Sequence, residues 1–167
     1  MTWNPTPPSK EVCFETLNTA LELGANFWNA GELYGTPEYN SCHLLNAYFT
    51  KYPHHADKVV LSIKGGNIPG QLRPDGSEKN IRRSVDECLR ILNGTKSIDI
   101  FECARQDPTT TIEQTVTILA QLVKEGKIGG IGLSEVDAES IRRAYVFMTR
   151  LKLQPVRPST NEKILTD

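Results

Sequence analysis

Short apolar segments and longer amphipathic segments alternate along most of this chain, and this alternation constrains its fold most strongly. The short segments, each about the length of a strand, are 25–28, 58–63, 97–101 and 128–133. Between them, apolar residues recur every three or four positions, as on one face of a helix. One such set is Ile81, Val85, Cys88 and Leu92. This order predicts a parallel sheet with helices outside it.

Residues that typically begin and end helices support the helical segments. Thr110 with Glu113 matches a capping box, and Asp137 can cap the helix that follows it. Thr36 followed by Pro37 matches an N-cap with proline at the first helical position. Glycines that follow a periodic segment, as helix-ending glycines do, are Gly24, Gly94 and Gly126. We therefore predict four strands and five helices in alternation, beginning with a helix.

Two architectures fit this alternation, an open doubly wound sheet and a (β/α)₈ barrel, and periodicity alone does not separate them. A closed barrel usually takes about 250 residues, whereas this chain has 167. The chain is therefore too short to close a barrel alone. A doubly wound domain would normally start with a strand, whereas the first element predicted here is a helix.

Composition and charge exclude several classes of protein. The formal net charge of −1 argues against a nucleic-acid partner, because such a protein needs a basic excess to neutralise phosphates. No apolar run approaches the roughly 18 residues of a membrane span. The N-terminus lacks the basic start and apolar core of a secretory signal. These features predict a cytoplasmic protein without a membrane partner.

The cysteines and histidines do not form a metal-binding pattern. No cysteine spacing matches a zinc or redox pair, so we expect reduced, buried thiols at Cys13, Cys42, Cys88 and Cys103. The histidines share no helical face with a carboxylate cluster, and we predict no metal site. His54 and His55 follow a proline in a polar segment, where we expect a solvated loop.

The glycine-rich run at 126–132 resembles a phosphate-binding loop only superficially. A dinucleotide fingerprint needs a strand, then glycines, then the N-terminus of a helix. Here a helix precedes the glycines, which lie in the predicted strand. We therefore interpret the run as close packing inside a sheet.

Tyr34 and Lys64 stand near the ends of two consecutive predicted strands. Barrels of this class keep their chemistry at the carboxyl ends of the strands. Taken singly, the two residues also fit a loop tyrosine and a solvated strand end. Together they form a recognisable pair, because a nearby ammonium makes a phenol a usable acid.

Several motifs follow one another in the order and at the spacing of the aldo-keto reductases. The segment 29–35, Asn-Ala-Gly-Glu-Leu-Tyr-Gly, resembles the Asp-Thr-Ala-x-x-Tyr-Gly motif after the family's second strand. Lys64 matches the lysine that ends the third strand, and 98–107 matches the fourth strand with its His-Arg-x-Asp ending. The pyridoxal-reductase-like branch is particularly similar at 1–3, 29–32, 62–66, 102–105 and 133–136.

This resemblance implies a partial (β/α)₈ TIM barrel, an α/β fold with parallel strands and outer helices. It implies hydride transfer from NADPH to a small-molecule carbonyl substrate, an aldehyde such as pyridoxal. The catalytic residues implied are Tyr34, Lys64 and Asn29. Ser134 and Glu135 are implied at the cofactor, and Trp3 in the substrate pocket.

Two of the family's four catalytic positions differ here. Asn29 replaces the aspartate that pairs with the lysine, and Ala104 replaces the histidine that orients the substrate. Glu102 lies two residues before Ala104 and so shares its strand face. If that face is inward, Glu102 could supply a carboxylate near Lys64; the alternative is that it pairs with another interior polar group.

The two ends depart further from the family. The resemblance implies one incomplete NADP-dependent oxidoreductase domain over 1–167, with a divergent tail at 146–167. The first strand and the part that grips the adenosine phosphate have no counterpart, so we expect impaired aldehyde reduction by this chain. The alternatives are a catalytically inactive partial barrel with a binding or regulatory role, or a gene-model fragment. The sequence defines neither the exact carbonyl substrate nor the oligomeric state.

Overall fold

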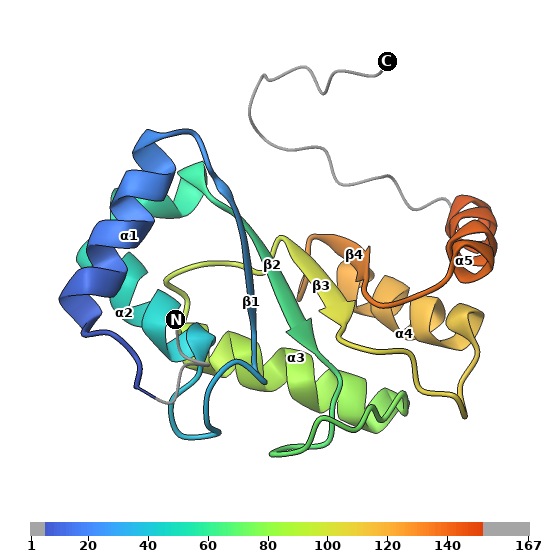
Figure 1. Ribbon diagram of the computed structural model, residues 1–167. Helices are drawn as coiled ribbons and strands as arrows, with labels where there is room; N and C mark the ends of the chain where they lie inside the picture. The colour runs from blue at the N-terminus through green and yellow to red at the C-terminus, as the bar shows by residue number, and fades with distance from the viewer. Residues whose placement is uncertain (1–5, 152–167) are drawn as a thin grey trace.

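A computed structural model describes residues 6–151, and these contain one parallel sheet and its helices. The strands are β1 (Phe27–Gly31), β2 (Val60–Gly65), β3 (Ile100–Cys103) and β4 (Gly130–Leu133). The helices are α1 (Lys10–Glu22), α2 (Ser41–Lys51), α3 (Glu78–Leu92), α4 (Ile112–Lys124) and α5 (Ala138–Arg150), with a short 3₁₀ helix η1 (Pro53–Lys58) after α2. Figure 1 shows the helices arranged around the strands, from α1 at one end to α5 at the other.

The strand order separates the two architectures that the sequence left open. The four strands lie in chain order, β1-β2-β3-β4, and every neighbouring pair is parallel. A doubly wound sheet reverses its strand order at a switch point, and the described strands contain no such reversal. The structure therefore confirms the partial (β/α)₈ barrel. Among residues 6–151, no helix is both long and apolar enough to span a bilayer.

One face of the sheet is apolar and packs against the helices. Trp28, Leu61 and Phe101 point to this face and belong to the main buried core. The predicted helical stripe meets them there, because Ile81, Val85, Cys88 and Leu92 are all fully buried. Strand residues alternate between faces, so the intervening residues point to the other side, the inside of the barrel.

Several predicted helix ends are confirmed. Asp137 caps α5, accepting a hydrogen bond from the Ser140 backbone N–H at 2.7 Å. The three helix-ending glycines adopt the left-handed backbone conformation that favours glycine, with φ of 83°, 74° and 72° at Gly24, Gly94 and Gly126.

Two predicted helix starts are wrong. The helix expected at Thr36 and Pro37 begins only at Ser41, because Thr36 closes a tight turn instead and accepts the Tyr39 N–H on its hydroxyl. The capping box predicted at Thr110 and Glu113 lies one residue later, since Thr111 and Gln114 bond each other reciprocally.

The first three strands end later than the sequence indicated, which moves candidate residues into them. β1 extends to Gly31, so Asn29 lies inside the strand rather than after it, and Lys64 is the penultimate residue of β2. His54 and His55 lie in η1 rather than in a loop, and His55 Nδ1 is 2.8 Å from the buried Tyr48 hydroxyl. The four cysteines are free thiols; three are buried and Cys103 is half-buried.

The start of α2 carries a pH-sensitive cap. The Asn40 side chain caps the helix, and the Asn40 N–H donates in return to Nδ1 of His43 at 3.2 Å. Burial lowers the pKa of His43, and the neighbouring Arg90 charge acts in the same direction. The neutral ring is therefore favoured in the folded protein, because a protonated Nδ1 cannot accept this bond.

We expect the folded protein to lose the stability that this cap contributes when the pH is lowered. As the pH falls below the ordinary histidine value of 6.5, the unfolded chain binds a proton here before the folded protein does, so stability is lost. The loss should be about 0.5–1 kcal/mol, the worth of a cap. Urea unfolding at pH 7.5 and pH 5 would measure it. His43→Gln keeps an acceptor at this position but does not titrate, so an equal acid loss in this variant would contradict the assignment.

Candidate active site

The inward face of the sheet gathers polar residues near the carboxyl ends of the strands. The strand register pairs Asn29 with Ser62, and it places Glu102 between Lys64 on β2 and Gly132 on β4. The polar residues come from β1, β2 and β3, and β4 contributes the glycine beside Glu102. In barrels of this class, chemistry takes place at this end, so the register brings the predicted Asn29 and Lys64 into one candidate site.

Glu102 stands at the centre of this group. Asn29 Nδ2 donates to Glu102 Oε1 at 2.8 Å, and the Ser62 hydroxyl donates to the same oxygen at 3.2 Å. Glu102 is only 8% exposed. These bonds confirm that Glu102 points inward, as expected from its spacing to Ala104. Its direct partners are interior polar groups; the ion pairs of residues 6–151 include none between Glu102 and Lys64 within 4.0 Å.

Glycine on β4 makes room for this carboxylate. A Cβ at Gly132 would lie 3.1 Å from the Glu102 Cβ and 2.9 Å from Cγ2 of Ile100. A Cβ at Gly129 would likewise meet the Asp99 carbonyl oxygen at 2.7 Å. The glycine-rich run therefore serves close packing within the sheet, as the sequence indicated.

Tyr34 lies in a turn that is tied to the start of α2. Its N–H donates to the Gly31 carbonyl at 3.2 Å, and its own carbonyl accepts the Ser41 N–H at 2.9 Å. The Ser41 hydroxyl also bonds both backbone groups of Gly31, at 2.8 and 2.9 Å. The half-buried tyrosine thus follows β1 directly at the carboxyl end of the sheet. Its predicted approach to Lys64 stays a prediction.

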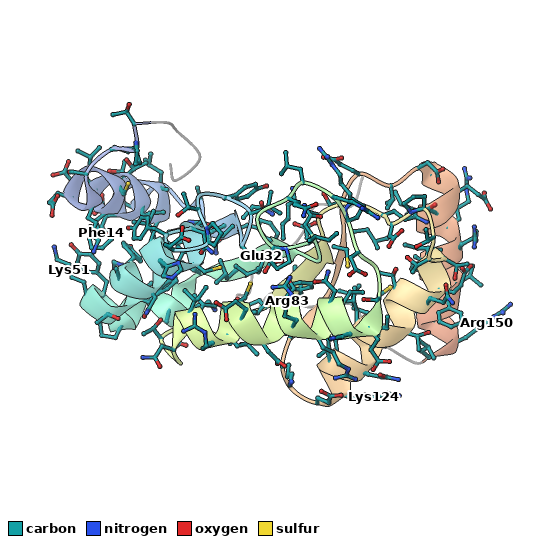
Figure 2. All side chains as sticks on the ribbon, turned by 90° about the horizontal axis from the view of Figure 1, so that it is seen from below. Phe14, Glu32, Lys51, Arg83, Lys124 and Arg150 are labelled. Carbon is teal, nitrogen blue, oxygen red and sulfur yellow. The ribbon has the colours of Figure 1, made fainter. Side chains whose placement is uncertain are left out.

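The side chain of Glu32 anchors the same turn to α3, a contact that the sequence did not reveal. The Ser84 hydroxyl donates to Glu32 at 2.6 Å. The two terminal nitrogens of Arg83 donate to the two Glu32 oxygens at 3.2 Å; Glu32 and Arg83 are both labelled in Figure 2. Ser84 also accepts the Gly66 N–H, just after β2, at 2.9 Å. Glu32 thereby joins the end of β1 to α3, and the same Ser84 hydroxyl joins the residue after β2 to this helix. The only hint in the sequence is a serine within the buried stripe of α3.

Of the predicted cofactor and substrate residues, two lie just after β4. Ser134 is half-buried and lines a small cavity with Cys103 and Thr115. Glu135 adopts a left-handed backbone conformation with φ of 51° and forms an exposed ion pair with Arg105 at 2.9 Å. Trp3 lies outside the described residues. The roles of Ser134 and Glu135 stay predictions.

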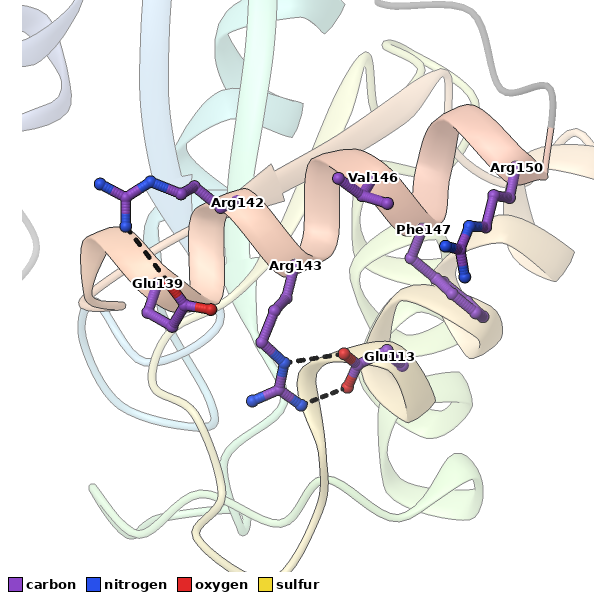
Figure 3. A pocket seen from close by; sticks show the side chains of 7 residues that line it. All are labelled: Glu113, Glu139, Arg142, Arg143, Val146, Phe147 and Arg150. Atoms are coloured by element: carbon purple, nitrogen blue, oxygen red, sulfur yellow. Dashed lines mark hydrogen bonds and ion pairs between the residues drawn. The ribbon is translucent and has the colours of Figure 1, made fainter.

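A larger hollow than the one beside Ser134 lies elsewhere, between α4 and α5, with a volume of about 460 Å³. Figure 3 shows its charged walls, where Arg143 forms two bonds with Glu113 and Arg142 pairs with Glu139. These carboxylates are already paired, and the hollow is remote from the inward strand residues. Within residues 6–151, no cluster of three or more potential metal ligands occurs. The carboxyl ends of the strands are therefore the better candidate for an active site.

Comparison with known proteins places this arrangement in a family. The family model described as the aldo/keto reductase family matches residues 1–165. The chain belongs to the aldo/keto reductase family. Its membership agrees with the parallel sheet, the outer helices and the position of Lys64 near the end of β2.

Similar proteins include reductases from fungi and bacteria. The chain is 46% identical over 149 residues to "Probable pyridoxal reductase 2" of Schizosaccharomyces pombe, which covers 89% of this chain and 45% of that protein. It is 32% identical over 142 residues to "Aldo-keto reductase yakc [NADP(+)]" of the same organism, covering 83% and 41%. It is 30% identical over 143 residues to "L-glyceraldehyde 3-phosphate reductase" of Escherichia coli, covering 82% and 40%. The chain thus spans less than half the length of these curated relatives.

Proposed function

We propose that this chain carries the catalytic half of an NADPH-dependent reductase that converts an aldehyde such as pyridoxal to the alcohol. The observation that supports this most directly is the inward polar group at the carboxyl ends of the strands, with Asn29, Lys64 and Glu102 on one face. Family membership and the similarity to a protein named as a pyridoxal reductase support the same chemistry and substrate class.

In this proposal Tyr34 donates the proton. When the aldehyde carbon accepts a hydride, its oxygen becomes an alkoxide, and the Tyr34 phenol delivers a proton to that oxygen. Lys64 stabilises the phenolate that remains, because an ammonium favours the charged form of a neighbouring acid. The Glu32 anchor and the Ser41 bonds keep the Tyr34 turn in place, since small displacements in a site are costly.

NADPH would supply the hydride when bound, and the described residues fit its nicotinamide end. The side chains of Ile100 and Glu102 fill the space beside Gly132 on β4, so the cofactor contact proposed here comes from the segment just after this strand. Ser134, which is half-buried directly after this strand, would hold the carboxamide of the ring. Glu135 is the next residue in the chain, and in this proposal it is a second cofactor contact.

The proposal is tested with two proteins. The first is the chain alone. The second, the hybrid barrel, is the Schizosaccharomyces pombe relative in which this chain replaces the matching part. NADPH oxidation is followed at 340 nm with pyridoxal as substrate. We expect steady turnover by the hybrid barrel and little by the chain alone, because most cofactor contacts of a family barrel lie outside the matched part. A folded hybrid barrel without turnover would contradict the proposed function and favour a non-catalytic binding role.

A further inference from the structure

Only two ionisable side chains occupy the inward positions of the described strands. These positions are Phe27, Asn29, Gly31, Val60, Ser62, Lys64, Ile100, Glu102, Gly130 and Gly132. The two ionisable residues are a lysine and a glutamate, and the register places them directly opposite each other on β2 and β3. Neighbouring strands lie about 4.8 Å apart, so the two side chains start from adjacent backbone positions, although their charged groups are not within 4.0 Å of each other in the described structure.

Glu102 needs a positive charge that its hydrogen bonds do not supply. A buried carboxylate is costly unless it is both hydrogen-bonded and electrostatically balanced. Asn29 and Ser62 satisfy one oxygen but are neutral. Lys64, half-buried on the adjacent strand, is the one cation among the inward positions of the described strands. Each charge therefore has the other as its counterpart across the β2–β3 pair.

We propose that Glu102 is the charge partner of Lys64, held in place by Asn29 and Ser62, and acts as a positioning residue for this lysine. The site then holds one carboxylate, that of Glu102 on β3, and the side chain that bonds it from β1 is the amide of Asn29. A second carboxylate at position 29 would lie 2.8 Å from Glu102 Oε1, the distance of the present hydrogen bond. Two carboxylates at this distance cannot both ionise. We call Asn29 and Glu102 a matched pair, because an amide at position 29 is compatible with the carboxylate at position 102, whereas a second carboxylate is not.

The consequence for chemistry rests on the proposed function. Glu102 does not act on the substrate directly; it acts through Lys64, whose charge stabilises the phenolate of Tyr34. The charge partnership itself requires no turnover, so it is tested separately from the reductase activity.

The first experiment moves the charge from β3 to β1. Asn29→Asp, Glu102→Gln and the double variant are made in the 167-residue chain, and thermal unfolding is followed at pH 7.5 and pH 5. We expect Asn29→Asp to lower the melting temperature at pH 7.5. At pH 5 the melting temperature of this variant should approach that of the parent, because one of the two carboxyls takes up a proton. The double variant, with one carboxylate again, should regain the melting temperature of the parent at both pH values.

Two results would overturn the matched pair. One is an Asn29→Asp variant with the stability and pH dependence of the parent. The other is a double variant that is no more stable than Asn29→Asp. If Asn29→Asp does not fold, restored folding in the double variant supports the pairing, and failure of both contradicts it.

The second experiment tests the link to Lys64. Glu102→Gln and Lys64→Met are combined in a double-mutant cycle at low salt and at 1 M NaCl. Glutamine can still accept from Asn29 and Ser62, so the substitution removes charge and preserves shape. We expect Glu102→Gln to destabilise the parent but not the Lys64→Met variant, with a coupling of about threefold or more in the folded-to-unfolded ratio. The coupling should shrink in high salt. Additive effects at both salt concentrations would show that Glu102 is a hydrogen-bond acceptor only.

Discussion

Replacement of Tyr34 by phenylalanine is expected to lower kcat for pyridoxal reduction by the hybrid barrel about 10²–10⁴-fold, the usual worth of a positioned general acid. The substitution removes only the phenolic oxygen. The turn around residue 34 is held by backbone bonds to Gly31 and Ser41, which phenylalanine keeps. KM should change little, because the proton is transferred in the transition state. Steady-state kinetics with NADPH and pyridoxal provide the measurement.

The matched control is Tyr39→Phe. Tyr39 belongs to the same connection between β1 and α2, and its ring stacks on His43. Loss of its hydroxyl should leave kcat within about twofold, because a surface substitution away from the chemistry has little effect. Equal kcat for Tyr34→Phe and the parent would remove Tyr34 as the proton donor. A large loss in both variants would indicate damage to the turn instead.

The second large effect is one of stability. Glu32→Ala is expected to lower the free energy of unfolding by about 3 kcal/mol, the low end for breaking a buried ion pair, since Arg83 remains partly exposed. The Glu32 side chain is 12% exposed, and it accepts bonds from both Ser84 and Arg83. Its removal leaves their donors without this partner, and the end of β1 loses its attachment to α3, whereas the bond from Gly66 to Ser84 remains. Urea unfolding of the 167-residue chain measures the change.

Another glutamate–arginine pair on α3 provides the control. Glu78 bonds Arg82 at 2.8 Å, but the glutamate side chain is 56% exposed. Glu78→Ala should therefore cost at most about 0.5 kcal/mol. If the two alanine variants lose similar stability, the Glu32 contacts are a surface pair in solution. Glu32→Gln should fall between them, because an amide keeps one acceptor oxygen but loses the charge.

The alternation of segments and the local caps were determined by the sequence alone. Strand and helix periodicity and the Asp137 cap depend on residues within a few positions of each other, and they predicted the elements in the right order. The wrong prediction of a helix start at Thr36 also depended on neighbouring residues only, because a threonine before a proline suits a tight turn as well. The motif order was sufficient to indicate the family, which the comparisons confirmed.

The partners of the inward residues were decided by the tertiary structure. Asn29 and Glu102 are 73 positions apart in the chain, and Glu32 and Ser84 are 52 apart. Their contacts depend on strand register and on where α3 packs. A shift of one residue in register would turn every side chain of a strand to the other face. The sequence placed a carboxylate on the right face at Glu102, but only the assembled sheet shows that it meets an amide on β1 and lies opposite a lysine on β2.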